Sequence, residues 1–357
     1  MSVFDSTGSV RAVGDRRHRA RIVTIALAVV LFLVSLVSLN VGASGTSVWP
    51  LLETMFLGGE MTARHRIILL DIRLPRLIEG IFIGAALAVS GALLQGLFRN
   101  PLADPGLVGV TAGASLGAVT AIVLGGFLPD AVLAKVGTWL VSISAFFGSW
   151  IATVLLYTVC TRAGRTSVAL MLLAGIAFQA LAGALTGIMI YLANDTQLRD
   201  LTFWQLGSLS GATWTKVSSA IPFICAALIA APFLARSLNG LALGEAAAAH
   251  LGIPVQRAKA LVVLAVACAV GAAVAVSGGI GFVGIVVPHL LRLVIGPDHR
   301  YLLVASGFLG AAMLIGADMI ARVIVSPAEL PIGIVTAIIG GPFFLSILLR
   351  NRSVLDV

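Results

Sequence analysis

Charged residues are scarce in this sequence. Asp, Glu, Lys and Arg make up 11% of its 357 residues, whereas they make up roughly a quarter of an ordinary soluble domain. Hydrophobic residues account for 59% and the mean hydropathy is +1.08, so a soluble fold would have too little interior for this much apolar surface. The few charges form short clusters between long apolar runs. The composition therefore predicts one membrane domain and argues against a soluble enzyme.

Motifs that define several soluble functions are also missing. No GxxxxGK[ST] phosphate loop occurs, so we expect no ATP hydrolysis by this chain. Residues 279–284 match the dinucleotide pattern GxGxxG, but they lie between two apolar runs without a strand, which argues against a nucleotide site. The three cysteines, Cys160, Cys225 and Cys268, and the five histidines are dispersed along the chain. We therefore predict no metal site and no catalytic residues.

The apolar runs have the length of membrane-spanning helices. A bilayer core of about 30 Å needs about 20 helical residues, and the runs are too long and too uniformly apolar for barrel strands. We therefore predict an all-α polytopic membrane protein with about ten transmembrane helices. The predicted spans are residues 21–40, 74–96, 106–126, 136–160, 168–192, 216–236, 258–276, 280–296, 302–322 and 332–349.

The distribution of Lys and Arg predicts the orientation. With the N-terminus inside, 15 of the 23 Lys and Arg residues fall in cytoplasmic segments, which favours N-in/C-in. The predicted organisation is a cytoplasmic tail of residues 1–20, one transmembrane domain of residues 21–350 and a cytoplasmic tail of residues 351–357. Basic residues do not form a continuous stripe, so we do not expect nucleic acid as a partner. A cleaved signal peptide is the alternative for the first span, but the apolar run of residues 22–39 is longer than a usual signal core.

Two local patterns predict how the helices begin and pack. Asp104 is suited to cap the third span, with Pro105 in its first turn. Glycines four residues apart allow helices to approach closely. These glycines are Gly80/Gly84, Gly109/Gly113/Gly117 and Gly183/Gly187.

Arginines cluster at the predicted outer face. Arg73 and Arg76 lie at the start of the second span, and Arg322 ends the ninth. An arginine at the bilayer centre would cost about 2.5 to 3.5 kcal/mol, so these should face water, headgroups or a partner. The residues alone favour snorkelling with local ion pairs, because Asp318 lies four residues before Arg322 and Glu79 three residues after Arg76.

The longest cytoplasmic connection, residues 238–259, contains an alanine run. Glu245 opens this run, and Gly252 and Pro254 end it. An acidic residue at the start and Gly and Pro at the end predict one short helix outside the bilayer. We expect a partner to dock on it.

Several strings spread along the chain resemble one family. They are RLPR at residues 73–76, GAALA and SG within 84–91, NPLADPGLVG at 100–109, LGS at 206–208, PHLLR at 288–292, DHR at 298–300 and ELPIG at 329–333. The chain thereby resembles the iron-chelate, cobalamin and haem uptake permeases of bacterial ABC importers of type II, which have ten spans per subunit. The resemblance implies a multi-pass protein of the bacterial inner membrane.

The resemblance also implies partners and site residues. The partners are a second copy of the chain, two ATP-binding cassette ATPase subunits that bind ATP and Mg²⁺, and a periplasmic substrate-binding protein. Acidic residues of that binding protein would contact Arg73, Arg76 and Arg322. The ATPase would contact a coupling segment. Its predicted contact residues are Glu245, Ala246, Ala247, His250, Leu251 and Gly252.

The substrate is predicted from residues 191–209, which look most like haem permeases. Haem is a flat apolar ring with two carboxylates, so aromatic, Met and cationic side chains would suit its passage. Met189, Tyr191 and Arg199 are the candidates, although Arg199 could instead pair with Asp195 at i,i+4. We therefore expect a permease that imports haem by alternating access, driven by partner ATPases and without a permanently bound cofactor of its own.

Other substrates and other function classes are the alternatives. A ferric siderophore or cobalamin would fit the same family. An ion-coupled secondary transporter would be expected to carry ionisable groups near the membrane midplane, which these spans lack. An intramembrane hydrolase would need a nucleophile with its base or a set of metal ligands, and the sequence shows no such set.

Overall fold

The computed structural model describes residues 3–4, 10–11, 16–42, 62–137, 139–163, 165–326 and 328–350. These residues form helices apart from two pairs of very short antiparallel strands. The elements in chain order are β1 (Val3–Phe4), β2 (Val10–Arg11), α1 (Arg17–Asn40), α3 (Ala63–Arg66), the π-helical η1 (Ile67–Arg73), α4 (Leu74–Phe98), the 3₁₀ turn η2 (Pro105–Val108), α5 (Val110–Leu124), the 3₁₀ turn η3 (Gly125–Phe127), α6 (Asp130–Val136), α7 (Leu140–Cys160), β3 (Thr161–Arg162), β4 (Arg165–Thr166), α8 (Val168–Leu192), α9 (Asp195–Leu206), α10 (Trp214–Leu241), α11 (Glu245–His250), α12 (Val255–Ser277), α13 (Val283–Ile295), α14 (His299–Val323) and α15 (Ile332–Arg350).

The all-α polytopic fold predicted from the sequence is confirmed. Among the described residues, eight helices are long and apolar enough to cross a membrane, and α13 and the apolar part of α15 are shorter. Each of the ten predicted spans overlaps one of these helices. The second span is longer than predicted, because α3, η1 and α4 form a continuous helical segment of 36 residues.

Three predicted spans begin later than expected: the one predicted at 136–160 starts at Leu140, and positive φ angles precede the late start of the other two. The span predicted at 280–296 is a helix of 13 residues that starts at Val283, because Gly278 and Phe282 adopt positive φ angles of 72° and 69° and interrupt the helix. The span predicted at 106–126 starts at Val110, because Gly109 has a φ of 79° after the turn η2. In both places the chain leaves helical geometry beside the middle of the bundle.

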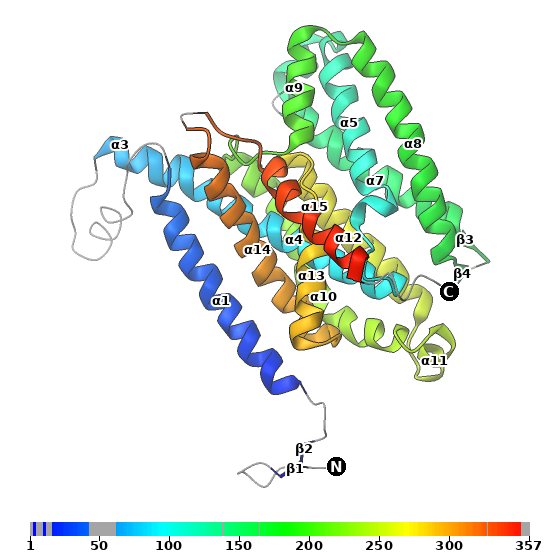
Figure 1. Cartoon of the computed structure of the whole chain (residues 1–357). Helices are drawn as coiled ribbons and strands as arrows, with labels where there is room; N and C mark the ends of the chain where they lie inside the picture. Colours follow the sequence, from blue (N-terminus) through cyan, green and yellow to red (C-terminus); the bar gives the residue numbers. More distant parts are fainter. Residues whose placement is uncertain are drawn as a thin grey trace.

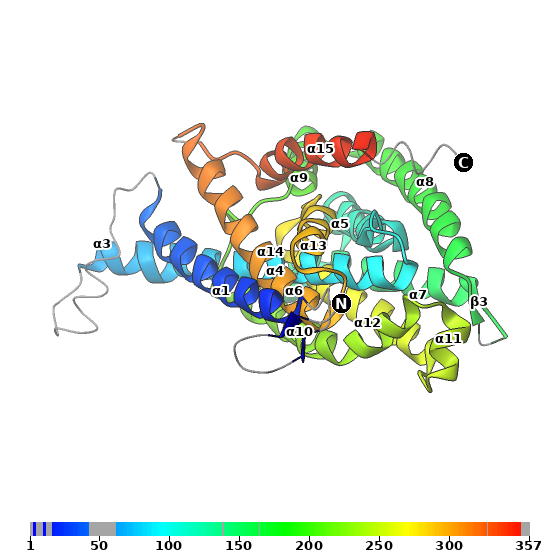
Figure 2. The same ribbon diagram turned by 60° about the horizontal axis from the view of Figure 1, so that its bottom comes forward.

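Helix α4 lies at the centre of the bundle, with α10, α12, α13 and α14 packed around it (Figure 1). Every residue from Ile83 to Phe98 is buried. By contrast, α1 and α8 lie on opposite flanks (Figure 2) and expose many of their apolar side chains. These apolar flanks are suited to lipid or to another membrane-embedded surface.

Small residues allow the closest helix contacts, as the sequence predicted. A Cβ on Gly84 would lie 2.4 Å from the Gly310 carbonyl oxygen of α14, and one on Gly113 would lie 2.3 Å from the Gly148 carbonyl oxygen of α7. Gly183 and Gly187 behave differently, because a Cβ on either would meet open space. The prediction of close packing is therefore right for Gly84 of α4 and Gly113 of α5, and among the described residues it is wrong for Gly183 and Gly187 of α8.

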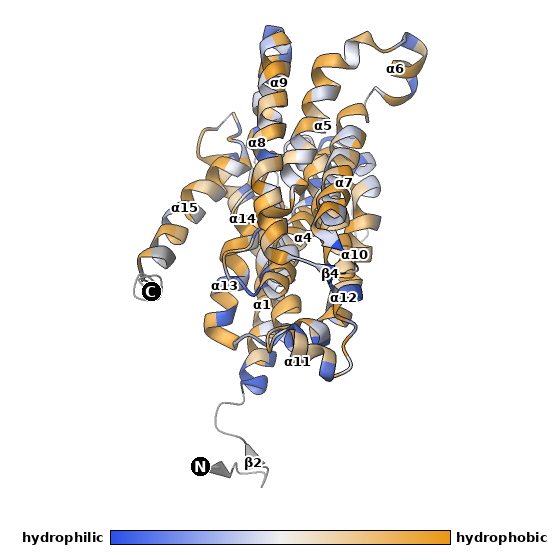
Figure 3. Cartoon of the chain, turned by 90° about the vertical axis from the view of Figure 1, so that its right-hand side faces the viewer, coloured by the Kyte–Doolittle hydropathy of each residue, from blue (hydrophilic) through white to orange (hydrophobic). Residues whose placement is uncertain are grey.

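The two ends of the bundle carry different short helices. Figure 3 shows α6 and α9 at one end, and α11 with the start of α1 at the opposite end. Helix α9 was not predicted, and it begins with a capping box in which Asn194 and Gln197 satisfy each other's backbone N–H groups. Because α11 and the start of α1 share one end, this arrangement agrees with the prediction that both are cytoplasmic.

Candidate functional site

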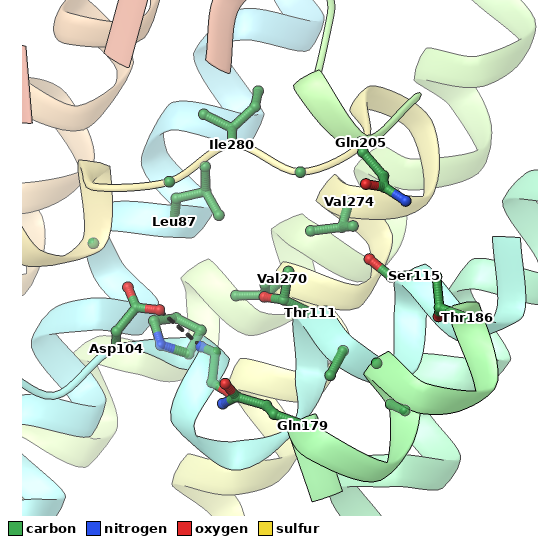
Figure 4. Close-up of a pocket in the computed structure, with 18 residues that line it drawn as sticks. Leu87, Asp104, Thr111, Ser115, Gln179, Thr186, Gln205, Val270, Val274 and Ile280 are labelled. Carbon is green, nitrogen blue, oxygen red and sulfur yellow. Dashed lines mark hydrogen bonds between the residues drawn. The ribbon is translucent and has the colours of Figure 1, made fainter. Parts of the chain in front are cut away.

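A cavity with a volume of about 580 Å³, lined by both polar and apolar residues, lies between α4, α5, α8, α9, α12 and the start of α13. This volume is within the range of sites that bind small molecules. Figure 4 shows that the lining side chains come from α4, α5, α8, α9 and α12 and from two irregular segments, residues 104–106 and 279–281. The described lining residues include one carboxylate and no basic side chain. The polar lining side chains are Asp104, Thr111, Ser115, Gln179, Thr186 and Gln205.

Irregular backbone borders this cavity at the depth of the middle of α4. A Cβ on Gly284 would lie 3.1 Å from the Leu87 carbonyl oxygen and 3.5 Å from the Asp104 carboxylate. Leu87 is 11 residues before the end of α4, about 16 Å along the helix. Non-helical backbone at membrane depth is tolerated where it is buried in protein or lines a water-filled space. The two helix breaks are therefore accommodated by burial in the bundle and by the cavity that they border.

Side chains satisfy the backbone of the first break. The Asp104 carboxylate accepts a hydrogen bond from the Gly106 N–H at 2.8 Å, so it caps η2 and not α5 as predicted. The Gln179 side chain of α8 donates to the Gly106 carbonyl oxygen, also at 2.8 Å. One turn earlier on α8, a Cβ on Gly175 would lie 1.9 Å from the Leu107 carbonyl oxygen. Helix α8 is thus in contact with the break at two successive turns.

We expect Gln179→Leu to reduce transport more than it reduces stability. The substitution removes the donor to the Gly106 carbonyl oxygen and should cost about 1 kcal/mol of folding stability, while the altered cavity wall lowers the initial rate of uptake several-fold. The control is Gln197→Leu, since Gln197 donates to the carbonyl oxygens of Ile122 and Val123 away from the cavity. Thermal unfolding and uptake are measured for both variants. Equal loss of uptake in both would contradict a special role for the cavity wall.

The arginines predicted for docking are inside the outer end of the bundle. Arg73, Arg76 and Arg322 are only 6%, 7% and 7% exposed. Arg76 forms ion pairs with Asp318 and with Glu329, each at 2.8 Å. The predicted i,i+4 pair of Asp318 with Arg322 is present at 3.1 Å. The structure records no ion pair between Arg76 and Glu79.

The other two arginines extend this cluster to α1. Arg322 donates to the Ser38 hydroxyl at 2.7 Å and to the Val41 carbonyl oxygen at 2.9 Å, and Arg73 donates to the Leu39 carbonyl oxygen. The carbonyl groups at the end of a helix have no partner within that helix, so these bonds satisfy the end of α1. The cluster therefore joins α1, α4 and α14, and a direct contact of these arginines with a partner stays a prediction.

The residues predicted to contact the substrate lie away from the cavity lining. Met189 packs against the small apolar cluster of Val119, Val123 and Leu201. Tyr191 is 88% exposed near the end of α8, and Arg199 is exposed on α9. Among the described residues, no ion pair joins Arg199 to Asp195. These positions correspond to the outer end of the bundle, so their contact with a substrate stays a prediction for its point of entrance.

The predicted helix of the long cytoplasmic connection is present as α11. It runs from Glu245 to His250, Leu251 is its C-cap, and Gly252 has a φ of 76°. The coupling residues Ala246, His250, Leu251 and Gly252 are exposed, while Glu245 and Ala247 are half-buried. The helix is therefore exposed at the end of the bundle, and its contact with a partner stays a prediction.

Three polar residues important to this geometry were not identified in the sequence. Gln95 donates to the Gly284 carbonyl oxygen at 3.1 Å and accepts a hydrogen bond from Arg292. Gln179 lies at the cavity, and Lys259 is buried beneath α11. A lone amide in an apolar run, such as Gln95 or Gln179, was the available signal, because such a group is costly in a membrane unless it is hydrogen-bonded.

The fold and this site define a class of protein. Apolar spans, two helices that begin late beside a polar cavity, and a short helix at one end of the bundle are the features of a polytopic membrane permease.

The comparisons with known proteins identify the family. The chain belongs to the FecCD transport family, whose profile matches residues 27–350, and it is a permease of the type II ABC importer class. It is 43% identical over 336 residues to the hemin transport system permease protein HmuU of Yersinia pestis, covering 94% of this chain and 98% of that protein. It is 42% identical over 316 residues to the cobalamin import system permease protein BtuC of Halobacterium salinarum, covering 87% and 82%.

A solved structure agrees with this fold over nearly its whole length. It is described as an inward-facing conformation of a metal-chelate type ABC transporter, with a TM-score of 0.80 and 29% identity. The similarity covers 92% of this chain and 99% of that one. The predicted membership of the iron-chelate, cobalamin and haem permeases is therefore confirmed.

Proposed function

We propose that this chain moves haem across the bacterial inner membrane as the permease of an ATP-driven importer. The observation that carries the proposal is the 43% identity to a hemin permease, which extends over 94% of this chain and 98% of the relative. The polar cavity supports it, because its volume of about 580 Å³ is suited to a bulky small molecule. Alternating access would open this cavity to one side of the membrane at a time.

The importer would contain further subunits. Two ATPase subunits would bind and hydrolyse ATP with Mg²⁺ and contact α11, whose exposed residues lie at the same end of the bundle as the start of α1. A second copy of the chain would complete the pathway. The exposed apolar side chains of α8, such as Leu173 and Ile176, support contact with lipid or with that copy.

A periplasmic substrate-binding protein would dock at the end of the bundle that carries α9. Since Arg73, Arg76 and Arg322 are buried, we propose that they support docking indirectly, by fixing the ends of α1, α4 and α14. A direct role would require these side chains to leave ion pairs whose atoms are already 2.8 to 3.1 Å apart.

Haem would meet different polar groups at two places. The described cavity lining has hydroxyl and amide donors, one carboxylate (Asp104) and no cation. The two carboxylates of haem would therefore be met there by neutral donors such as Ser115 and Thr186, on the side of the cavity away from Asp104 (Figure 4). Arg199 is exposed on α9 at the outer end, where it would meet the carboxylates as haem enters from the binding protein.

Cobalamin is the second candidate substrate. The 42% identity to a cobalamin permease covers 87% of this chain, nearly as much as the similarity to the hemin permease. Cobalamin carries amide groups that would pair with a lining of hydroxyl and amide side chains such as Ser115 and Gln205.

Uptake into proteoliposomes tests the proposal. The vesicles contain this chain, its ATPase and its binding protein, and ATP-dependent haem accumulation is measured with a ferric siderophore and with cobalamin as competitors. We expect haem uptake that neither competitor reduces. Transport of a competitor without haem uptake would retain the permease and overturn the substrate. Uptake driven by a proton gradient without ATPase would instead indicate a secondary transporter.

A further inference from the structure

A buried lysine lies where α11 meets the rest of the bundle. Lys259, in the second turn of α12, is 2% exposed and is among the largest fully buried side chains of the described residues. Its ammonium group donates to the Glu245 carboxylate of α11 at 2.7 Å and to the Thr166 carbonyl oxygen of β4 at 2.8 Å. One ammonium group therefore links α11 to the β3–β4 hairpin.

Thr166 of the hairpin makes two hydrogen bonds with α12. The Thr166 N–H donates to the Gln256 side chain at 3.0 Å, while its carbonyl oxygen accepts from Lys259. Both backbone groups of Thr166 are thus paired with side chains from the first turns of α12. The two-residue strands themselves are joined by the hydroxyl groups of Thr161 and Thr166 at 2.9 Å. A hairpin this short depends on such contacts for its position.

The hairpin leads directly into the helix that lines the cavity. Only Ser167 separates Thr166 from α8, and its side chain accepts from the Leu170 N–H as the N-cap. Eleven residues further along α8, about 16 Å, Gln179 contacts the helix break at Gly106. A displacement of the hairpin would therefore reach the cavity wall through one continuous helix.

Helix α8 is suited to move as a unit. Only Met171, Gly175 and Ala182 of its 25 residues are buried in the described structure. A helix with few buried apolar contacts meets little resistance from packing. Within this chain it packs against α5, α7 and the turn η2.

We infer that Lys259 is the positioning residue that transmits movement of α11 to α8, and thereby couples the ATPase to the cavity. The inference deepens the proposed function, since it rests on the chain being an ATP-coupled permease. Apolar side chains could replace a buried ammonium group without loss of folding stability. They would not, however, join α11 to the β3–β4 hairpin by hydrogen bonds.

The first test is Lys259→Met, which keeps most of the side-chain volume and removes both hydrogen bonds. We expect the complex to assemble and to hydrolyse ATP within about twofold of wild type, while uptake per ATP falls about tenfold, a typical size for coupling between sites. Arg236→Met is the matched control. It also removes one positive charge, from an exposed position near the end of α10 that leads to α11. Wild-type uptake per ATP in Lys259→Met would overturn the inference.

A second measurement needs neither haem nor the variant, so its failure is distinguishable from failure of the proposed substrate. Spin labels are placed at Arg162 and Ala249, and a reference pair at Arg162 and Arg99, in a chain whose cysteines are replaced by alanine. In the complex with the ATPase, we expect the Arg162–Ala249 distance to be the same with and without ATP while the reference distance changes. A change in the first distance at least as large as in the second would show that α11 and the hairpin are not linked.

Discussion

Arg76→Met is expected to destabilise the permease by about 3 kcal/mol, which is what the loss of one partner of a buried ion pair typically costs. The Arg76 side chain is 8% exposed and pairs with Asp318, which is 5% exposed. Its second partner, Glu329, is 37% exposed and can be solvated when Arg76 is removed. Asp318 keeps its pair with Arg322 at 3.1 Å, so the expected loss is at the lower end for buried pairs.

The measurement is thermal unfolding of the purified permease, together with its affinity for the binding protein. Arg66→Met is the control, since Arg66 is exposed on α3, seven residues before Arg73. We expect Arg76→Met to lower the unfolding midpoint and the control to leave it unchanged. Normal stability of Arg76→Met with lost binding would show that Arg76 acts by direct contact with the partner.

The predicted and observed partners of Arg76 differ, and the difference shows which ion pairs can be predicted from the sequence. Local spacing pointed to Glu79, three residues away. The actual partners, Asp318 and Glu329, are separated from Arg76 by 242 and 253 positions in the chain. Spacing predicts the pairs within one helix, such as Asp318 with Arg322. Pairs between helices depend on which helices become neighbours, and hydropathy carries no such information.

Hydropathy located the spans well because each is a long apolar run, but it could not locate the helix breaks. Residues 280–282 lie in a loop but continue the apolar run of the next helix, so hydropathy could not locate the start of α13 at Val283. Lys259 was counted as a cytoplasmic charge from its position near the end of a run. Its burial results from the folding of the β3–β4 hairpin and α11 over α12.

The alanine helix α11 and the glycines of α4 were predicted because their signals are local. Glu245 at the start and Gly252 at the end define α11, and Gly84 marks a face that must approach another helix. The cavity was not predicted, because its lining comes from six helices and two loops that are distant in sequence.

Gly91→Ala is expected to have the other large effect, because it adds one methyl group where two backbones meet. A Cβ at Gly91 would lie 1.9 Å from the Gly284 carbonyl oxygen and 2.6 Å from the Gly284 Cα. Backbone atoms cannot move aside as a flexible side chain can, so α4 and α13 must separate. Overpacking of this kind costs about 3 kcal/mol. The separation would also break the hydrogen bond from Gln95 to the same carbonyl oxygen, which measures 3.1 Å.

The effect of Gly91→Ala should extend from stability to transport, since Gly284 lines the cavity. We expect lower yield of folded protein in membranes, a lower unfolding midpoint, and reduced uptake by the protein that does fold. Gly316→Ala on α14 is the matched control, because a Cβ there would meet open space and alanine favours the helix. If both variants unfold and transport as the wild type does, α4 and α13 do not cross at Gly91 and Gly284, and the cavity they border is not the pathway. If only Gly91→Ala is impaired, the late start of α13 and its close packing against α4 together keep the pathway open.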